Sequence, residues 1–437
     1  MITARAFAGK HFAVLGLARS GLATIEALLA SGGKVTAWDD KDEAREKAAD
    51  AAIELSHNLD RVDLAFEDFV GGDLSRFDSV VVTPGLPLNR HPIAARANEA
   101  GVEIIGDIEL FARARSELPS HRVVGITGTN GKSTTTALVH HILKTAGVPT
   151  EMGGNIGLPI LSQDPLPEGG VYVLELSSYQ LDLTQSLDCD VAVLLNITPD
   201  HLDRYDGFES YAASKARLFA MQSPGKLAVV DYRSEADEGV LDDAEDPIIQ
   251  FIDDVRMGDQ TAWPSLQGPH NRQNSAAAFA TCEMLGLTNE QIEGGLRTYA
   301  GLPHRMERVR EKGGVLFVND SKATNPTATA PALAAFDQVR WICGGQAKAN
   351  NLDECAPHFG HVVKAYTIGE AGEMFATLLS PHMDVAECVT LGEAVKAAAS
   401  EAGKGDTVLL SPACASFDQF RDFEARGDAF RSLVGEL

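Results

Sequence analysis

Short apolar runs rich in β-branched residues alternate with segments of helical periodicity along the chain. The runs in HFAVLGL, FDSVVVT, RVVGIT, VYVLEL and VAVLLN have the length and composition of buried strands. The segment STTTALVHHILKTAG, which follows RVVGIT after a glycine-rich stretch, is predicted to be a helix with Leu138 and Ile142 on one face. This alternation predicts an α/β fold with largely parallel sheets.

The alternating pattern falls into three blocks, so we predict three domains at residues 1–110, 111–301 and 302–437. The first block begins with a strand, a tight turn and a helix, and the second opens with RVVGIT. The third carries GVLFVND, VRWICGG, KAYTIGE and DTVLLSP, which are strands that end in glycine or polar turns. An acidic stretch at residues 232–260 interrupts the second block and is predicted to be irregular.

Composition and charge narrow the class of protein. The net charge of -25 argues against broad nucleic-acid binding, which requires a basic surface. Six cysteines without a C-x-x-C pair favour free thiols in a reducing compartment over disulfides or a zinc site. Arg19 and Glu26 interrupt the apolar N-terminal stretch, unlike in a secretory signal, and no run of about 18 apolar residues predicts a transmembrane helix. We therefore expect a cytoplasmic protein without membrane insertion.

The first glycine-rich turn, GLARSG at residues 16–21, lies where dinucleotide-binding proteins carry G-x-G-x-x-G. Ala18 replaces the middle glycine, and Asp39 follows at the distance of a ribose-binding acid. Three interpretations remain open. The turn can bind a nicotinamide cofactor, it can hold another diphosphate through Ser20 and the helix start, or it can be a tight turn that binds nothing.

The second glycine-rich segment, GITGTNGKSTTT, has the strand–loop–helix context of a phosphate-binding loop. Its GKS tripeptide (131–133) matches the second half of G-x-x-x-x-G-K-[ST], although Ile126 occupies the position of the first glycine. We predict that the backbone N–H groups of residues 129–133 and the Lys132 ammonium bind phosphate oxygens. The Ser133 hydroxyl is predicted to bind Mg²⁺.

Polar residues also follow the next two predicted strands. Glu175 lies in an otherwise apolar run, where a buried carboxylate would be costly without a cation, so we predict a magnesium ligand. The alternative is an outward-facing glutamate on an edge strand. Asp200, His201 and Asp203 follow the third strand of this block. Because Mg²⁺ prefers oxygen ligands, the chemistry allows His201 to be a substrate contact as readily as a metal ligand.

Eight segments together resemble the Mur ligase family: GITGTNGKSTTT, GGNIG, LELSSYQL, NITPDHLDRY, GPHNRQNSAAA, GLPHRMERV, NDSKATNP and LLSPACASFDQF. The resemblance covers essentially the whole chain, and SKATN and SPACASFDQF are typical of the member that adds D-glutamate. It implies a Rossmann-like N-terminal domain that binds a UDP-substrate, a central P-loop-type ATPase domain with a mostly parallel sheet, and a C-terminal Rossmann-like α/β domain that binds the amino acid.

The implied activity is that of an ATP-dependent, ADP-forming acid–amino-acid ligase. The resemblance implies that it adds D-glutamate to UDP-N-acetylmuramoyl-L-alanine through an acyl phosphate in peptidoglycan precursor synthesis, and that the protein is a monomer. Two alternatives remain: another amino-acid ligase of the family, of the L-alanine-adding or folylpolyglutamate type, and a nucleotide-dependent switch. An assay of D-glutamate against other amino acids separates the ligases, and amide formation excludes the switch.

The resemblance also assigns roles to individual residues. The implied ATP contacts are Gly128, Thr129, Asn130, Gly131, Lys132, Ser133, Thr134, Asn274, Arg305 and Asp320. The implied ligands of two Mg²⁺ ions are Ser133, Glu175, His201 and a carbamylated Lys215, and the implied catalytic residues are Lys132, Glu175, His201 and Lys215. The implied contacts to the UDP-substrate are Arg19, Ser20, Asp39, Thr83, Asn155 and His201, and those to D-glutamate are Lys322, Thr324, Lys348, Ser416 and Phe423. Ala18, Ser214 and Ala349 depart from residues that are more common in the family.

Overall fold

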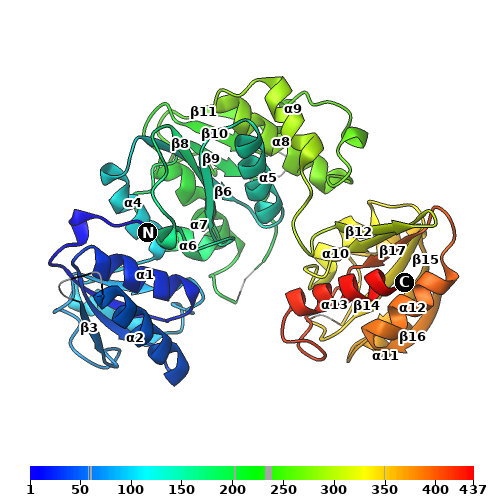
Figure 1. The fold of residues 1–437 in the computed structure, drawn as a ribbon, viewed down its shortest axis with the longest axis horizontal. Coiled ribbons are helices and arrows are strands. Elements are labelled where there is room, and N and C mark those ends of the chain that lie inside the picture. The colour runs from blue at the N-terminus through cyan, green and yellow to red at the C-terminus, as the bar shows by residue number, and fades with distance from the viewer. Residues whose placement is uncertain (58, 60–61, 201–202, 232–238, 349) are drawn as a thin grey trace. The chain divides into compact units, whose positions relative to one another are not determined.

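The computed structural model describes residues 1–437 except 58, 60–61, 201–202, 232–238 and 349 (Figure 1). The chain forms two compact units, one of residues 1–256 with 276–295 and the other of residues 257–275 with 296–437. The first unit contains two parallel sheets and the second contains one mixed sheet. The prediction of an α/β fold with mostly parallel sheets is confirmed.

The first sheet has the strand order β3-β2-β1-β4-β5, and all its strands are parallel. This order is that of a dinucleotide-binding fold without its sixth strand. Its strands are β1 (His11–Leu15), β2 (Lys34–Trp38), β3 (Asp63–Phe66), β4 (Ser79–Val82) and β5 (Glu103–Ile105). Its helices are α1 (Arg19–Ala30), α2 (Asp42–Ser56) and α3 (Pro92–Ala100), and a 3-10 turn, η1 (Arg5–Phe7), precedes β1.

The second sheet is also parallel, with the order β11-β10-β9-β6-β8-β7. Its strands are β6 (His121–Thr127), β7 (Thr150–Gly154), β8 (Gly170–Glu175), β9 (Val191–Leu194), β10 (Leu227–Val230) and β11 (Ile248–Phe251). The associated helices are α4 (Asp107–Ala114), α5 (Lys132–Thr145), α6 (Ser178–Asp182), α7 (Phe208–Ala220), α8 (Pro269–Met284) and α9 (Asn289–Thr298). Short 3-10 helices are η2 (Arg115–Glu117), η3 (Ile160–Ser162), η5 (Ile252–Asp254) and η6 (Gln260–Ala262).

The third sheet has the order β12-β13-β17-β14-β15-β16, in which only the β12–β13 pair is antiparallel. Its strands are β12 (Glu307–Lys312), β13 (Val315–Asn319), β14 (Val339–Gly344), β15 (Val362–Ile368), β16 (Asp384–Val389) and β17 (Thr407–Leu410). Its helices are α10 (Pro326–Leu333), α11 (Gly372–Leu379), α12 (Leu391–Glu401) and α13 (Phe423–Glu436), with η7 (Ala356–His361). Trp341 and Ile342, neighbours on β14, pack into different hydrophobic clusters, so helices cover both faces of this sheet.

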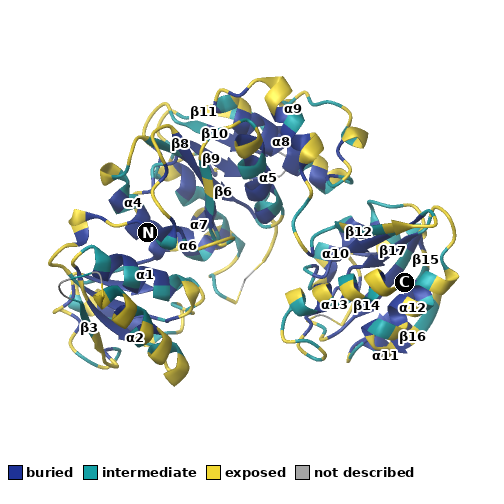
Figure 2. Ribbon diagram, viewed as in Figure 1, coloured by how far each residue is buried: buried dark blue, intermediate teal, exposed yellow. Residues whose placement is uncertain are grey.

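The apolar pattern of the sequence accounts for the core. The central strands of all three sheets are largely buried (Figure 2), and the helix predicted after the phosphate loop is α5, with Leu138 and Ile142 fully buried. One local prediction, that the whole acidic stretch is irregular, was wrong. Part of the acidic stretch forms the edge strand β11 and η5, since Ile248 and Phe251 supply enough apolar surface to pair with β10. Residues 232–238 of that stretch lie outside the described residues.

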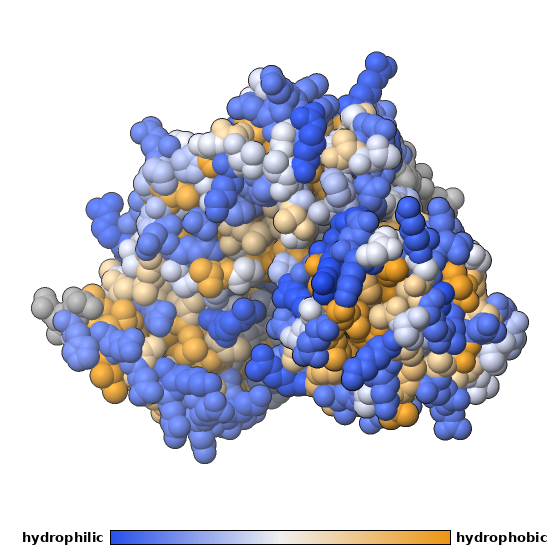
Figure 3. Space-filling model, turned by 45° about the vertical axis from the view of Figure 1, so that its right-hand side comes forward, coloured by the Kyte–Doolittle hydropathy of each residue, from blue (hydrophilic) through white to orange (hydrophobic). Residues whose placement is uncertain are grey.

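The surface agrees with the composition. Hydrophilic side chains cover much of the face in Figure 3, with smaller groups of hydrophobic residues between them. All six cysteines are buried free thiols, as predicted. Among the described residues, none of the helices combines the length and the apolar character that a membrane span requires.

Candidate functional site

The predicted phosphate loop connects β6 to α5 at the carboxyl end of the second sheet. Gly131 caps α5 with φ of 87°, a left-handed conformation that favours glycine. Lys132 and Ser133 therefore occupy the first two positions of a 14-residue helix. Backbone N–H groups and the positive end of the helix dipole make such a position suitable for anions.

Asn196, two residues after the end of β9, holds the loop in place. The N–H of Thr129 donates to the Asn196 carbonyl at 2.8 Å, and the N–H of Asn130 donates to Asn196 Oδ1 at 2.9 Å. The Asn196 amide in turn donates to the Asn130 carbonyl at 3.1 Å. These two N–H groups are bonded to Asn196 in the structure, and the binding of phosphate by residues 129–133 stays a prediction. A polar residue at the end of an apolar strand was the signal that could have identified Asn196.

Two lysines converge on one carbonyl oxygen of the loop. Lys132 Nζ donates to the carbonyls of Gly128 at 2.9 Å and Thr129 at 2.8 Å, and Lys215 Nζ donates to that of Gly128 at 2.9 Å. Lys215 lies on α7 with 1% of its surface exposed, and its ammonium packs 4.5 Å from the centre of the Tyr211 ring. Burial, reinforced by the positive charge of Lys132, lowers the pKa of Lys215 to about 6.

Glu175 ends β8, which lies between β6 and β7 in the interior of the sheet. The alternative of an outward-facing residue on an edge strand is therefore wrong. The side chain is buried, with 2% of its surface exposed. Its Oε1 accepts a hydrogen bond of 2.9 Å from Asn155 Nδ2, whereas its Oε2 has no partner among the described residues. A buried carboxylate oxygen of this kind is suited to a cation.

The other predicted metal ligands lie in the same part of the fold or outside the described residues. Ser133 is buried in the first turn of α5. Asp200, which was not among the predicted ligands, is exposed in the segment after β9. His201 lies outside the described residues. Among the residues that the structure describes, no three His, Cys, Asp or Glu side chains are grouped as they would be around a metal ion.

The first sheet places the residues predicted for the UDP-substrate at the carboxyl ends of its central strands. Asp39 Oδ2 accepts a 2.8 Å hydrogen bond from the Leu17 N–H, which joins the end of β2 to the turn after β1. Thr83, after β4, lies so close to Gly16 that a Cβ on Gly16 would be 2.4 Å from its hydroxyl. Arg19 and Ser20 begin α1 beside this turn. Arg19, Ser20, Asp39 and Thr83 thus lie around one turn, and Asn155 lies beside Glu175.

The second unit holds the remaining predicted nucleotide residues. Asp320 follows β13 and is buried; its carboxylate accepts from the Met306 N–H at 3.1 Å and from the Ser411 hydroxyl at 2.8 Å. Burial raises the pKa of Asp320 to about 7. Arg305 directly precedes Met306, so the backbone brings it next to Asp320. Asn274 is buried in α8, where its amide donates to Asn271 Oδ1 at 3.2 Å.

The predicted D-glutamate contacts are distributed over three loops of the second unit. Lys322 Nζ lies 3.9 Å from the centre of the Phe423 ring, so these two side chains are brought together. Thr324 follows on the same loop and is half-buried, Ser416 is buried, and Lys348 is exposed. Among the described residues, no contact joins Lys348 to the others, and Ala349 lies outside this part of the chain.

Arg426 on α13 connects two of these loops, and no sequence motif indicated this role. The side chain is 1% exposed, and it donates to the Ser321 hydroxyl and carbonyl at 3.0 and 2.9 Å. It also donates to the carbonyls of Cys414 at 3.0 Å and Ala415 at 3.2 Å. Burial lowers the pKa of this guanidinium to about 10. The loops before Thr324 and before Ser416 are therefore held together by one buried cation.

Three family descriptions match successive parts of the chain. A Mur ligase MurD-like N-terminal domain matches residues 10–106, a Mur ligase middle domain matches residues 126–253, and a Mur ligase glutamate ligase domain matches residues 304–414.

Two relatives that match this chain over its full length have the same name. The UDP-N-acetylmuramoylalanine--D-glutamate ligase of Novosphingobium aromaticivorans is 59% identical, over 100% of this chain and 97% of that protein. The protein of the same name from Sphingopyxis alaskensis is 57% identical over 100% of both chains. Among solved structures, the MurF ligase of Thermotoga maritima in complex with ADP has a TM-score of 0.62 at 16% identity, covering 98% of this chain and 96% of that one. At this identity the likeness concerns the fold alone.

Proposed function

Because this chain belongs to the Mur ligase family, we propose that it is an ATP-dependent, ADP-forming ligase that joins D-glutamate to UDP-N-acetylmuramoyl-L-alanine in peptidoglycan precursor synthesis. The observation that carries this proposal is the 59% identity, over the whole chain, to a relative that is named for this reaction. The phosphate loop at the start of α5 supports the use of ATP.

The reaction must make a carboxylate reactive toward an amine. The alanyl carboxylate attacks the γ-phosphorus of ATP, the bond to the β–γ bridging oxygen breaks, and ADP leaves with that oxygen. The D-glutamate amine then attacks the acyl phosphate, the C–O bond breaks, and phosphate departs while the amine loses a proton. In this scheme Lys132 neutralises the oxygens of the transferred phosphoryl group as charge shifts toward ADP.

The residues around Glu175 fit a divalent cation. Its buried Oε2 lacks a partner among the described residues, and oxygen ligands suit Mg²⁺. We propose that Ser133 and Glu175 hold one Mg²⁺ and that His201 and Lys215 hold a second. When bound, the two ions supply positive charge for the phosphate oxygens. An ammonium cannot be a metal ligand, so we propose that Lys215 carries a carbamate; its burial and the absence of a salt bridge to it among the described residues support this.

The remaining assignments complete the proposal. Residues 1–110, 111–301 and 302–437 are the proposed UDP-substrate, ATP and amino-acid domains. The proposed contacts to the UDP-substrate are Arg19, Ser20, Asp39, Thr83, Asn155 and His201, and those to D-glutamate are Lys322, Thr324, Lys348, Ser416 and Phe423. Asn274, Arg305 and Asp320 are proposed ATP contacts along with residues 128–134. A cytoplasmic monomer fits a reaction on nucleotide substrates.

An amino-acid panel tests the function. With UDP-N-acetylmuramoyl-L-alanine and ATP present, phosphate release should depend on D-glutamate and should be far slower with L-glutamate, L-alanine or glycine. Release with UDP-N-acetylmuramate and L-alanine, or with a folate and glutamate, would assign the chain to another reaction of the family. Release that depends on no acceptor at all would favour the nucleotide-dependent switch.

A further inference from the structure

The turn that carries Arg305 has an unusual backbone. His304 and Met306, the residues on either side of Arg305, have φ of 60° and 48°. Side chains other than glycine rarely adopt this left-handed region, and such conformations persist only where the surroundings enforce them. The contacts that enforce this turn therefore affect where Arg305 lies.

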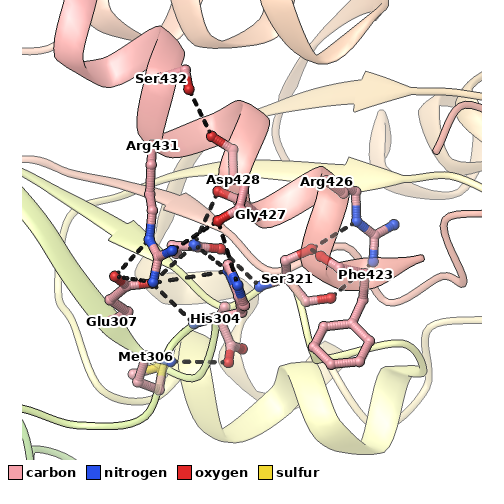
Figure 4. A network of polar contacts seen from close by, with 12 residues as sticks. His304, Met306, Glu307, Ser321, Phe423, Arg426, Gly427, Asp428, Arg431 and Ser432 are labelled. Carbon is pink, nitrogen blue, oxygen red and sulfur yellow. Dashed lines mark hydrogen bonds and ion pairs between the residues drawn. The ribbon is translucent and has the colours of Figure 1, made fainter. Parts of the chain in front are cut away.

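Glu307 is the residue that closes the turn (Figure 4). Its Oε2 accepts a 2.9 Å hydrogen bond from the N–H of His304, three residues earlier. The same oxygen accepts from Asn319 Nδ2 at 3.0 Å. Its Oε1 is paired with the Arg431 guanidinium of α13 at 2.8 and 2.7 Å. Both carboxylate oxygens are used, so Glu307 fastens the turn to β13 and to α13 at once.

The His304 ring is fixed by the same neighbours. Its Nδ1 lies 3.0 Å from Asn319 Nδ2, and because an amide nitrogen can only donate, Nδ1 accepts. Asn319 Nδ2 also lies 3.2 Å from the Gly427 carbonyl. A Cβ on Gly427 would be 2.1 Å from His304 Nδ1, so only glycine allows α13 to pass this closely. The turn therefore has no room to relax toward the helix.

The fastened turn presents two of the proposed nucleotide residues together. The N–H of Met306 donates to Asp320 Oδ1 at 3.1 Å, which ties the residue after Arg305 to the Asp320 carboxylate. On the other side, the His304 carbonyl accepts from the Lys322 N–H at 3.0 Å. A shift of the turn would consequently move Arg305 relative to Asp320, although Lys322 is also packed on the Phe423 ring.

We propose that Glu307 and Asn319 are positioning residues that hold the left-handed turn and thereby set Arg305 and Asp320 for the nucleotide. This inference rests on the proposed function, in which Arg305 and Asp320 contact ATP. Neither positioning residue touches the nucleotide; each acts through the backbone of residues 304–306. Gly427 and Arg431 serve the same arrangement from α13, the first by leaving space and the second by orienting the Glu307 carboxylate.

The test is Glu307→Gln in the full-length protein, with Glu311→Gln on the same strand as the matched control. Glu311 pairs only loosely with Arg308, at 3.8 Å, and does not contact the turn. We expect Glu307→Gln to raise the Kd for ATP, measured by calorimetry, and the KM for ATP by about 10-fold or more, because small displacements of a positioning group are costly. The KM for D-glutamate should change less than about threefold, since Lys322 keeps its contact with Phe423.

A double variant separates positioning from general stability. If Glu307 acts through Arg305, adding Glu307→Gln to Arg305→Ala should not weaken ATP binding further. A lower Tm with unchanged ATP binding in Glu307→Gln, or full additivity with Arg305→Ala, would overturn the inference. If Glu307→Gln does not fold, Gly427→Ala is the second variant; it keeps every polar group and should weaken ATP binding in the same way.

The proposed function and the positioning role of Glu307 can fail separately. If D-glutamate is not ligated by the unaltered protein, the proposed function fails, while ATP binding by calorimetry still reports on the turn. If ligation occurs and Arg305→Ala weakens ATP binding but Glu307→Gln does not, the positioning role alone is overturned.

Discussion

Lys132 and Lys215 donate hydrogen bonds to the same backbone oxygen, that of Gly128, each at 2.9 Å. The two lysines come from different helices, and burial together with the Lys132 charge lowers the pKa of Lys215 to about 6. At neutral pH the pair therefore combines a cation at the phosphate loop with a neutral amine behind it. A neutral amine is the form of lysine that reacts with CO₂, which gives the two lysines different chemical roles.

The first prediction concerns Lys132. Replacing it with alanine should lower kcat by about 10²–10³, because the lost charge acts on phosphate oxygens in the transition state. Lys144, exposed in the last turn of the same helix, provides the control: Lys144→Ala should retain normal turnover. Steady-state kinetics together with a thermal melt measures both. Near-normal turnover in a folded Lys132→Ala protein would contradict the phosphate-loop assignment.

A second prediction concerns the modification of Lys215. Lys215→Ala should be inactive and partly restored by short carboxylic acids, which can replace the carbamate oxygens. Lys215→Arg introduces a permanent positive charge and cannot form a carbamate, so it should be inactive as well. Gentle mass spectrometry of the unaltered protein should find one added CO₂ on this residue. Full activity of the protein with an unmodified Lys215 in CO₂-free buffer would exclude the carbamate.

More of the fold than of the site could be predicted from the sequence, because burial of a strand leaves a pattern in its residues. Strands buried on both faces, such as β6 and β8, read as continuous apolar runs. Edge strands such as β11 carry a partly exposed face and do not show this signal, so the part of the acidic stretch that forms β11 was wrongly predicted to be irregular. Lys132 could be singled out because the phosphate-loop pattern lies in adjacent residues, and Glu175 because a carboxylate is unusual in an apolar strand; the roles of both residues stay predictions.

Other site residues could not be recognised in this way. Arg426 donates to backbone carbonyls of a distant segment, and such a partner leaves no pattern in the sequence. The sequence signal for Asn196 was only that a polar residue follows an apolar strand, which does not reveal its bonds to the phosphate loop. The contacts that hold the turn at His304 could not be predicted either, because Glu307, Asn319 and Gly427 are distant in the sequence or on different elements and meet only in the fold.

A third prediction addresses the amino-acid pocket. D-glutamate brings two carboxylates to a protein of net charge -25, so binding must depend on a few placed donors. Lys348→Ala should raise the KM for D-glutamate by about 10- to 100-fold, the range for a lost hydrogen bond to a charged group, and affect the KM for ATP much less. Lys396→Ala, on the exposed side of α12, is the control. If the KM for ATP rises instead, the pocket lies elsewhere.

A fourth prediction concerns stability and pH. Asp107, at the start of α4, is buried with Oδ2 unpartnered among the described residues, and burial raises its pKa to about 6. An unfolded aspartate titrates near 3.9. The folded state thus binds this proton more tightly, and the stability it contributes below about pH 4 is lost as the pH rises through about 6.

Asp107→Asn should remove that loss, so its free energy of unfolding relative to the unaltered protein should increase between pH 4 and pH 7. Urea unfolding at several pH values measures this, with Asp50→Asn on the exposed face of α2 as the control. An identical pH dependence in Asp107→Asn and the unaltered protein would show that Asp107 is ionised in the fold throughout.

The central claim is that the protein activates the alanyl carboxylate of its UDP-substrate by phosphorylating it. UDP-N-acetylmuramoyl-L-alanine labelled with oxygen-18 in that carboxylate tests this directly, with ATP and D-glutamate present. Because the acyl C–O bond breaks when the amine attacks, we predict that the released inorganic phosphate carries one labelled oxygen for each D-glutamyl amide formed, as read by mass spectrometry. Unlabelled phosphate, released with or without amide formation, would contradict the acyl phosphate and the account built on it.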